Sequence, residues 1–129
     1  MTTSATNLSV TTIGGNIDLE NMLDSSVLVS SLVTGSGSVD LRQSGGGDLT
    51  FGDVSASTSA TIINQGGSVA LNGTLVSDSL AVTATGSLSD GDSGAISVAG
   101  LGTVSASDIT LGDSAGNATS FGGLIFTSP

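Results

Sequence analysis

Short pairs of apolar residues, each pair separated by one residue, recur along this chain, and their spacing constrains the fold more than any other feature. Such a pair is typical of a β-strand with one buried face. Every second pair begins about 20 residues after the one before it, which is the length of a solenoid repeat. The first residues of these pairs are Leu8, Val27, Leu49, Val69, Leu88 and Ile109. This regularity predicts a β-solenoid in which each repeat forms one coil.

Two nearly identical segments support this period. DLTFGDVSAS begins at Asp48, and DITLGDSAGN begins at Asp108, sixty residues later. Sixty residues are three coils of about 20 residues, so the two segments should lie on the same side of the solenoid. Asp53 and Asp113 then occupy equivalent corners after strands, where we expect each side chain to bond the local backbone of its turn.

A single coil of this sequence cannot fold alone. It holds roughly five apolar side chains worth roughly 1.5–3 kcal/mol each when buried, whereas ordering about 20 residues costs on the order of 30 kcal/mol. Stacking the coils at about 4.8 Å closes the backbone ladder and joins the apolar side chains into a continuous core. We therefore predict an all-β chain with one domain over residues 1–129, a parallel β-solenoid of about six coils. The residues predicted to point inward are Val10, Ile17, Leu19, Leu41, Leu49, Phe51, Val69, Leu71, Val82, Ile109 and Leu111.

Three alternatives remain open from the pattern alone. An antiparallel β-sandwich also has short strands every 8–12 residues. The segment from Asp18 to Val33 has apolar residues at helical spacing, so a short helix or a bulging loop could interrupt the coils there. From Ile96 to Val104 the apolar residues leave the regular phase, which indicates a lengthened or irregular coil.

The charge balance excludes several kinds of partner. The chain has 11 acidic residues and a single basic one, Arg42, with a formal net charge of −10. Nucleic acids and anionic membrane surfaces are bound through Lys and Arg, so neither is an expected partner. No stretch is apolar enough for direct membrane insertion as a helix, and the N-terminal MTTSATNLSV lacks the features of a signal peptide. A targeting signal for an exported protein would therefore lie outside this chain.

The most repeat-like segments are DLTFGDVSAS, SLAVTATGSLSDG and SDITLGDSAGNATSFGGLIFTS. They resemble the repeats of the filamentous haemagglutinin-like adhesins of bacteria, and the resemblance covers most of the chain. It implies a right-handed parallel β-helix at the bacterial cell surface or outside the cell, as a structural or adhesive shaft cut from a longer repeat protein. Its partners would be a host or matrix surface ligand. The resemblance transfers no functional residues, because the matching positions are core and turn positions.

The residues needed for catalysis are largely missing. The chain has no His, Cys, Lys or Tyr, and sites that cleave sugars combine clustered carboxylates with basic groups. Asp40 and Arg42 form the only pair of opposite charges two residues apart, and we expect an exposed ion pair of small energetic value. The sequence therefore predicts no enzymatic activity.

Calcium is the candidate cofactor. The loop SDGDSG places Asp90 and Asp92 two residues apart among glycines, and Ca²⁺ takes six to eight oxygen ligands from loops of this kind. The competing interpretation is that both residues are turn formers. A further alternative is an ice-binding solenoid, which would need stacked Thr-x-Thr rows. The chain has one such triplet, Thr83–Thr85.

The strand pattern begins by Leu8 and continues into GLIFTSP at the other end, with no amphipathic helix over either end. An exposed rung of a solenoid is an edge ready to pair with another chain. The sequence therefore favours either a segment of a longer protein or a subunit that associates with itself end to end.

Overall fold

The chain forms a β-solenoid of about six turns of roughly 21 residues. The computed structural model describes residues 2–91, 94–112 and 118–128, and all regular elements in these ranges are β-strands. The strands are β1 (Thr2–Thr3), β2 (Asn7–Thr12), β3 (Ile17–Asn21), β4 (Val27–Thr34), β5 (Val39–Gln43), β6 (Leu49–Ser55), β7 (Ser59–Asn64), β8 (Val69–Leu71), β9 (Thr74–Ser77), β10 (Ser79–Ala84), β11 (Leu88–Ser89), β12 (Ala95–Ser105), β13 (Ile109–Thr110) and β14 (Thr119–Thr127).

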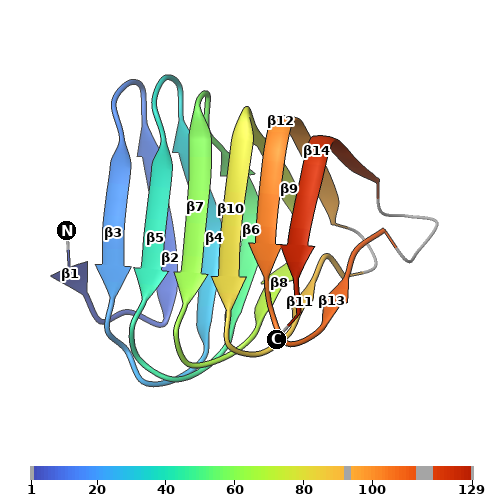
Figure 1. Cartoon of the computed structure of the whole chain (residues 1–129). Coiled ribbons are helices and arrows are strands. Elements are labelled where there is room, and N and C mark those ends of the chain that lie inside the picture. The colour runs from blue at the N-terminus through green and yellow to red at the C-terminus, as the bar shows by residue number, and fades with distance from the viewer. Residues whose placement is uncertain (1, 92–93, 113–117, 129) are drawn as a thin grey trace.

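The strands stack into three faces, which we name from Figure 1. The front face contains β3, β5, β7, β10 and the C-terminal halves of β12 and β14. The back face contains residues 9–12 of β2, the C-terminal halves of β4 and β6, β9, and the N-terminal halves of β12 and β14. The base face contains the N-terminal parts of β4 and β6 with β8, β11 and β13.

The coil is right-handed. In Figure 1 the chain descends along each front strand, rises along the back strands and advances from left to right. All strand pairs among the described residues are parallel, including the pairing of Leu49 with Val69. The parallel solenoid is thereby confirmed, and the β-sandwich alternative is wrong because a sandwich pairs its strands antiparallel.

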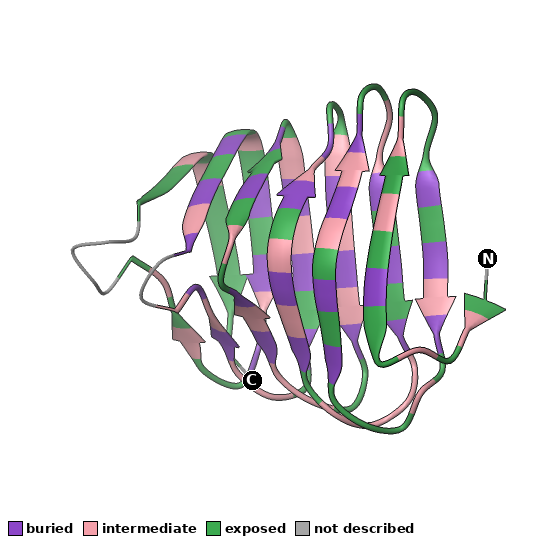
Figure 2. Ribbon diagram, turned by 180° about the vertical axis from the view of Figure 1, so that it is seen from behind, coloured by how far each residue is buried: buried purple, intermediate pink, exposed green. Residues whose placement is uncertain are grey.

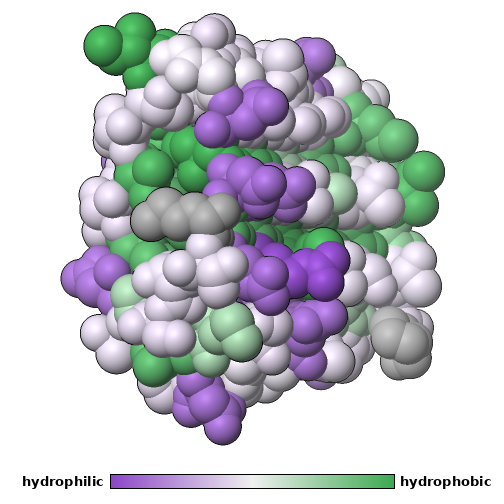
Figure 3. Space-filling model, turned by 90° about the vertical axis from the view of Figure 1, so that its left-hand side faces the viewer, coloured by the Kyte–Doolittle hydropathy of each residue, from purple (hydrophilic) through white to green (hydrophobic). Residues whose placement is uncertain are grey.

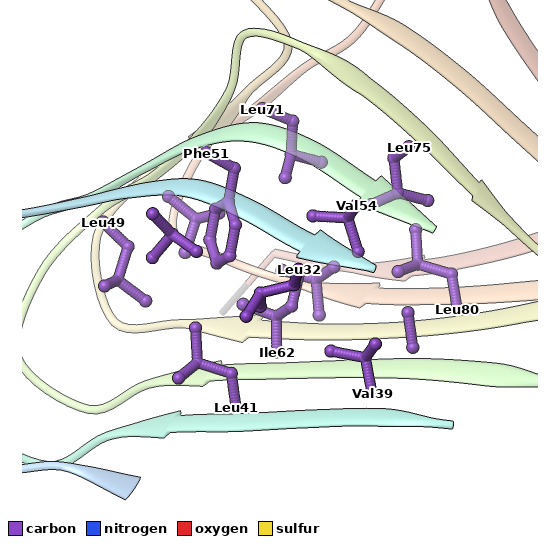
Figure 4. Packing of buried hydrophobic residues seen from close by; sticks show 14 of the residues in the cluster. Leu32, Val39, Leu41, Leu49, Phe51, Val54, Ile62, Leu71, Leu75 and Leu80 are labelled. Atoms are coloured by element: carbon purple, nitrogen blue, oxygen red, sulfur yellow. The ribbon is translucent and has the colours of Figure 1, made fainter. Parts of the chain in front are cut away.

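The core consists of apolar columns that run along the rod, because inward and outward side chains alternate along the strands of the inner coils (Figure 2). One front-face column follows the register pairs from Leu19 through Leu41, Ile62 and Val82 to Val104. The base face contributes the column from Val27 to Ile109. Figure 4 shows how side chains from different faces converge on the same interior. The fully buried members with the largest side chains are Phe51, Leu32, Leu41, Leu49, Ile62, Leu71, Leu75 and Leu88.

Most of the predicted core is buried as expected, with three exceptions. Val10, Ile109 and Leu111 are only partly buried, although they pack against the core cluster. Val10 belongs to the first full coil, and the other two belong to the last coils. The inward phase of these three residues is correct but their burial is incomplete, whereas Ile17 and Leu19 in the same coil as Val10 are buried.

The segment from Asp18 to Val33 contains no helix. It forms β3 and β4, joined by residues 22–26. The helical alternative is wrong because the alternation of Ile17 with Leu19 and of Val27 with Val29 places these side chains in the core columns. Tertiary stacking therefore outweighs the local helical spacing.

The irregular coil expected from Ile96 to Val104 is confirmed. These residues lie in β12, which passes from the back face to the front face as one long strand, with a shift in register against β14 between Val98 and Leu101. Gly102 takes the core position of this coil on the front face. A Cβ there would overlap the ring of Phe121, so the Phe121 ring occupies the space that a side chain at Gly102 would need.

A ladder of buried amides supports the corner between the front and base faces. Asn21, Gln43 and Asn64 are register neighbours and are fully or almost fully buried. The Asn64 Nδ2 donates to the carbonyl oxygens of Gly47 (3.1 Å) and Ser68 (2.9 Å). Burying an amide is favourable only when it is hydrogen-bonded; the Nδ2 of Asn64 meets this condition, whereas the buried Oε1 of Gln43 has no hydrogen-bond partner among the described residues.

Candidate functional site

Asp90 follows β11 and is completely buried. Its Oδ2 accepts hydrogen bonds from the backbone N–H of Gly112 (2.8 Å) and from the Oγ1 hydroxyl of Thr119 (3.1 Å). Both donors come from the following coil. The Asp90 carboxylate therefore ties one coil to the next, because a buried carboxylate is stable only when donors surround it.

The proposed partner of Asp90 in a calcium site, Asp92, lies outside the described residues. Within the described ranges, no three acidic, His or Cys side chains gather closely enough to hold a metal ion. Calcium binding by Asp90 and Asp92 stays a prediction from the sequence. The contacts of Asp90 supply a structural role that the sequence did not reveal, because both donors are more than 20 residues away.

The other corner carboxylates behave similarly. The Oδ1 atoms of Asp24, Asp48 and Asp53 accept from backbone N–H groups one coil further along, with distances of 2.7, 2.9 and 3.0 Å. The prediction that Asp53 bonds the backbone of its own turn is wrong, because its Oδ1 accepts from the N–H of Thr74 in the next coil. The stacking distance of about 4.8 Å brings the N–H groups of the next coil within reach of an Asp side chain. Asp113, the equivalent corner three coils on, lies outside the described residues.

Asp40 and Arg42 are both exposed on the outward side of β5, as predicted. In the ladder Asp40 lies beside Asp18, and Arg42 lies beside Glu20. The one basic side chain of the protein therefore lies between Glu20 and Ile63 in the ladder. Exposed charges of this kind contribute little stability, and their arrangement provides no basic patch for an anionic ligand.

The Thr-x-Thr triplet is not part of a stacked row. Thr83 lies between Ile63 and Ser105 in the front-face ladder. The hydroxyl of Thr85 donates to the carbonyl oxygen of Asn64 (3.2 Å), so it takes part in a hydrogen bond between two coils at the corner. The ladder at these positions therefore does not supply the repeated Thr pairs that an ice-binding face requires.

The first full coil carries an apolar groove between β2 and β3. The groove has a volume of about 300 Å³ and is lined by Val10, Thr12, Asn16, Ile17, Asp18 and Leu19. Figure 3 looks onto this end of the rod and shows apolar surface in hollows between polar ridges. We call the groove lined by these six residues the end groove. The short strand β1 pairs with Glu20 and Asn21, and the side chains of Ile17 and Leu19 in the groove wall are buried, with exposed fractions of 5% and 2%.

The last coil exposes apolar side chains of β14. Leu124, Ile125 and Phe126 are 41%, 54% and 65% exposed, and we call them the end patch. Leu124 and Phe126 occupy inward positions, because they stack on Gly102 and Val104. They are exposed because no further coil covers them among the described residues.

No helix among the described residues has the length and apolar character needed to cross a membrane. Comparison with protein-family models, with curated proteins and with solved structures finds no match to this chain.

Proposed function

We propose that the chain is a structural shaft, a stiff β-solenoid segment of a filamentous protein at the bacterial cell surface or outside the cell. The observation that supports it most directly is the uninterrupted parallel ladder from β3 to β14 on the front face. Each coil contacts only its neighbours, so such a structure can be extended by repetition without a new core. This is the geometry that a spacer or stalk requires.

The outer surface fits this role. Along the front face the outward positions after Arg42 are Ile63, Thr83 and Ser105, and those after Asp40 are Thr61, Ala81 and Thr103. These side chains are uncharged, and all but Ile63 are small, which suits a parallel stack because like charges directly above one another repel. The resemblance to haemagglutinin-like repeats supports the same proposal.

Surface labelling tests the location. Antibodies raised against the chain should stain intact cells of the source organism, and external proteinase K should remove the staining before it degrades a cytoplasmic marker. Staining that appears only after the cells are made permeable would contradict a surface or extracellular shaft.

Single-molecule pulling tests the mechanical role. With handles at both ends, the chain should unfold in successive steps, each releasing one coil of extended chain, or roughly 70 Å for about 21 residues. Step spacing that is unrelated to the coil length, or extension at negligible force, would contradict a load-bearing shaft.

A further inference from the structure

The corner between β8 and β9 contains a dipeptide that occurs nowhere else in the chain, Asn72–Gly73. Each of the other asparagines is followed by Leu, Ile, Met, Gln or Ala. A glycine in the following position has no Cβ, so it leaves its own backbone nitrogen accessible and its backbone free to turn. Asn72 is therefore the asparagine whose side chain is most open to attack by the nitrogen of the next residue.

The stacking of the coils requires glycine at position 73. A Cβ there would overlap the backbone of Gly52 in the preceding coil and would lie against the Oδ1 of Asp53. Any larger residue would push the two coils apart, which is costly in a closely packed stack. The fold thus imposes the neighbour that makes Asn72 reactive, and Asn72 itself is exposed at the corner, where water reaches it.

The two neighbouring coils hold this dipeptide in place. The N–H of Asn72 donates to the carbonyl oxygen of Phe51 in the preceding coil (3.0 Å), and the N–H of Ala95 in the following coil donates to the carbonyl oxygen of Gly73 (3.0 Å). A Cβ at Gly91 would overlap the Oδ1 of Asn72, so the side chain also lies against the following coil. Rotation of the bond between the Cα and the carbonyl carbon of Asn72 therefore requires that the corner opens first.

The reaction available to the open corner is closure of a cyclic imide. The Gly73 nitrogen attacks the Cγ of Asn72, a bond forms between these two atoms, and the Cγ–Nδ2 bond breaks. Nδ2 leaves as ammonia and takes the proton of the Gly73 nitrogen with it. Water then opens the ring at either carbonyl carbon. Attack at Cγ gives aspartate with an unchanged backbone, whereas attack at the backbone carbonyl carbon gives isoaspartate, whose main chain is longer by one atom.

We propose that Asn72 is a site of spontaneous conversion to aspartate and isoaspartate, and that opening of the corner between β8 and β9 limits the rate. Isoaspartate lengthens the main chain between Leu71 and Leu75, which are 2% and 1% exposed and lie in the core (Figure 4). The modified coil therefore stacks less stably on its neighbours. This goes beyond the shaft proposal, because it requires only the stacked corner and water.

Peptide mass spectrometry on chains aged in mildly alkaline buffer tests the site. In urea, where the chain is unfolded, Asn72 should acquire the mass of an acid faster than any other asparagine. In the folded chain the conversion should be at least about tenfold slower, because only the small open fraction reacts. Asn72 that stays intact in the unfolded chain, or that reacts equally fast in the folded one, would overturn the proposal.

Two aspartate variants test whether this corner is the gate. The Oδ1 of Asp53 accepts from the N–H of Thr74, directly after the dipeptide (3.0 Å). Asp53→Ala should accelerate the conversion of Asn72 about threefold or more, because the corner loses one hydrogen bond. Asp48→Ala is the matched control, since the exposed Asp48 makes the same kind of bond to the N–H of Ser68, before β8 (2.9 Å). This variant should leave the rate unchanged.

The rates of the two variants are compared well below the melting temperature of either one, and circular dichroism checks that both are folded. Equal acceleration in both variants would show that opening of the whole rod controls the reaction. No acceleration in Asp53→Ala would show that the tie to Thr74 does not restrain the dipeptide. Either result would overturn the proposed gate at this corner.

The isoaspartate form tests the consequence for the stack. Chromatography separates it from the aspartate form, which Asn72→Asp reproduces with the same charge and an unchanged backbone. The isoaspartate chain should melt at a lower temperature than Asn72→Asp, because its longer main chain displaces Leu71 or Leu75 from the core. Equal melting temperatures would show that the corner accommodates the added atom, and would overturn the proposed weakening of the stack.

Discussion

At the scale of single residues, burial determines which side chains hold the coils together. Phe51 is the largest of the fully buried side chains and is 1% exposed. It stacks between Val29 and Leu71 in the ladder. The Phe126 side chain has the same chemistry but is 65% exposed in the last coil.

These two phenylalanines provide a matched pair. Phe51→Ala should lower the free energy of unfolding by about 3–5 kcal/mol, because it removes buried surface and leaves a cavity. Phe126→Ala should lower it by less than about 1 kcal/mol, because its side chain is already largely exposed. Urea denaturation measures both values, and equal losses would contradict the assigned core.

Asp90 supplies a second test at this scale. Asp90→Ala should lower the free energy of unfolding by about 1–3 kcal/mol, because the Gly112 N–H and the Thr119 hydroxyl lose their acceptor. The loss should be the same with millimolar Ca²⁺ as with a chelator. If Ca²⁺ stabilises the unmodified chain but not the variant Asp90→Asn/Asp92→Asn, then the calcium prediction is correct and the purely structural role is wrong.

At the scale of elements, the corners set how closely the coils stack. Gly47, in the corner between β5 and β6, has a φ of 103°, and a Cβ there would overlap the backbone of Ser25 in the preceding coil. Gly15, in the corner between β2 and β3, has a φ of 91° but open space around the place of a Cβ. Comparing alanine substitutions at the two glycines therefore separates the cost of backbone strain from the cost of steric overlap.

Gly15→Ala should cost about 1–2 kcal/mol of stability, through its unfavourable φ alone. Gly47→Ala should cost at least about 1 kcal/mol more, because the added methyl group also pushes two coils apart. Thermal melting of the two variants side by side gives the comparison. A smaller loss at Gly47 than at Gly15 would mean that the corner relaxes without moving the coil beneath.

At the scale of the whole molecule, stability is a sum over neighbouring coils, as expected for a solenoid. In the front-face ladder Ala60 lies opposite Leu80, and Val39 lies opposite Ala60. Leu80 can therefore take the position of Ala60 over Val39 if one coil is removed. On the base face, Leu88 would then lie over Leu49.

A chain lacking residues 60–79 should accordingly fold into a solenoid shorter by one coil, with cooperative melting and a β-sheet circular dichroism spectrum. A chain lacking residues 60–69 loses about half a coil, which places outward side chains in the core, and it should not fold. If both deletions fold equally well, or if neither folds, then the coils are not interchangeable units.

The period of the apolar pairs was sufficient to predict the fold class, the number of coils and most inward positions. Alternation along a strand is local, so Leu49 and Phe51 face the same way in any strand they form, and a constant repeat then aligns equivalent residues. Alternation does not reveal the degree of burial: Val10 and Ile109 are only partly buried, whereas Ile17 in the same coil as Val10 is buried.

The contacts between coils were decided by the tertiary structure alone. Three of these contacts depend on which backbone groups lie about 4.8 Å away in an adjacent coil. Asp90 accepts from Gly112 and Asp53 accepts from Thr74, both in the following coil, and Asn64 donates to Gly47 in the preceding one. A Ser-, Asn- and Asp-rich corner has many equivalent polar residues, so composition and spacing cannot select the bonded pair. The register of the stacked coils determines which pair is bonded. It also determines which side chains form the end groove and the end patch.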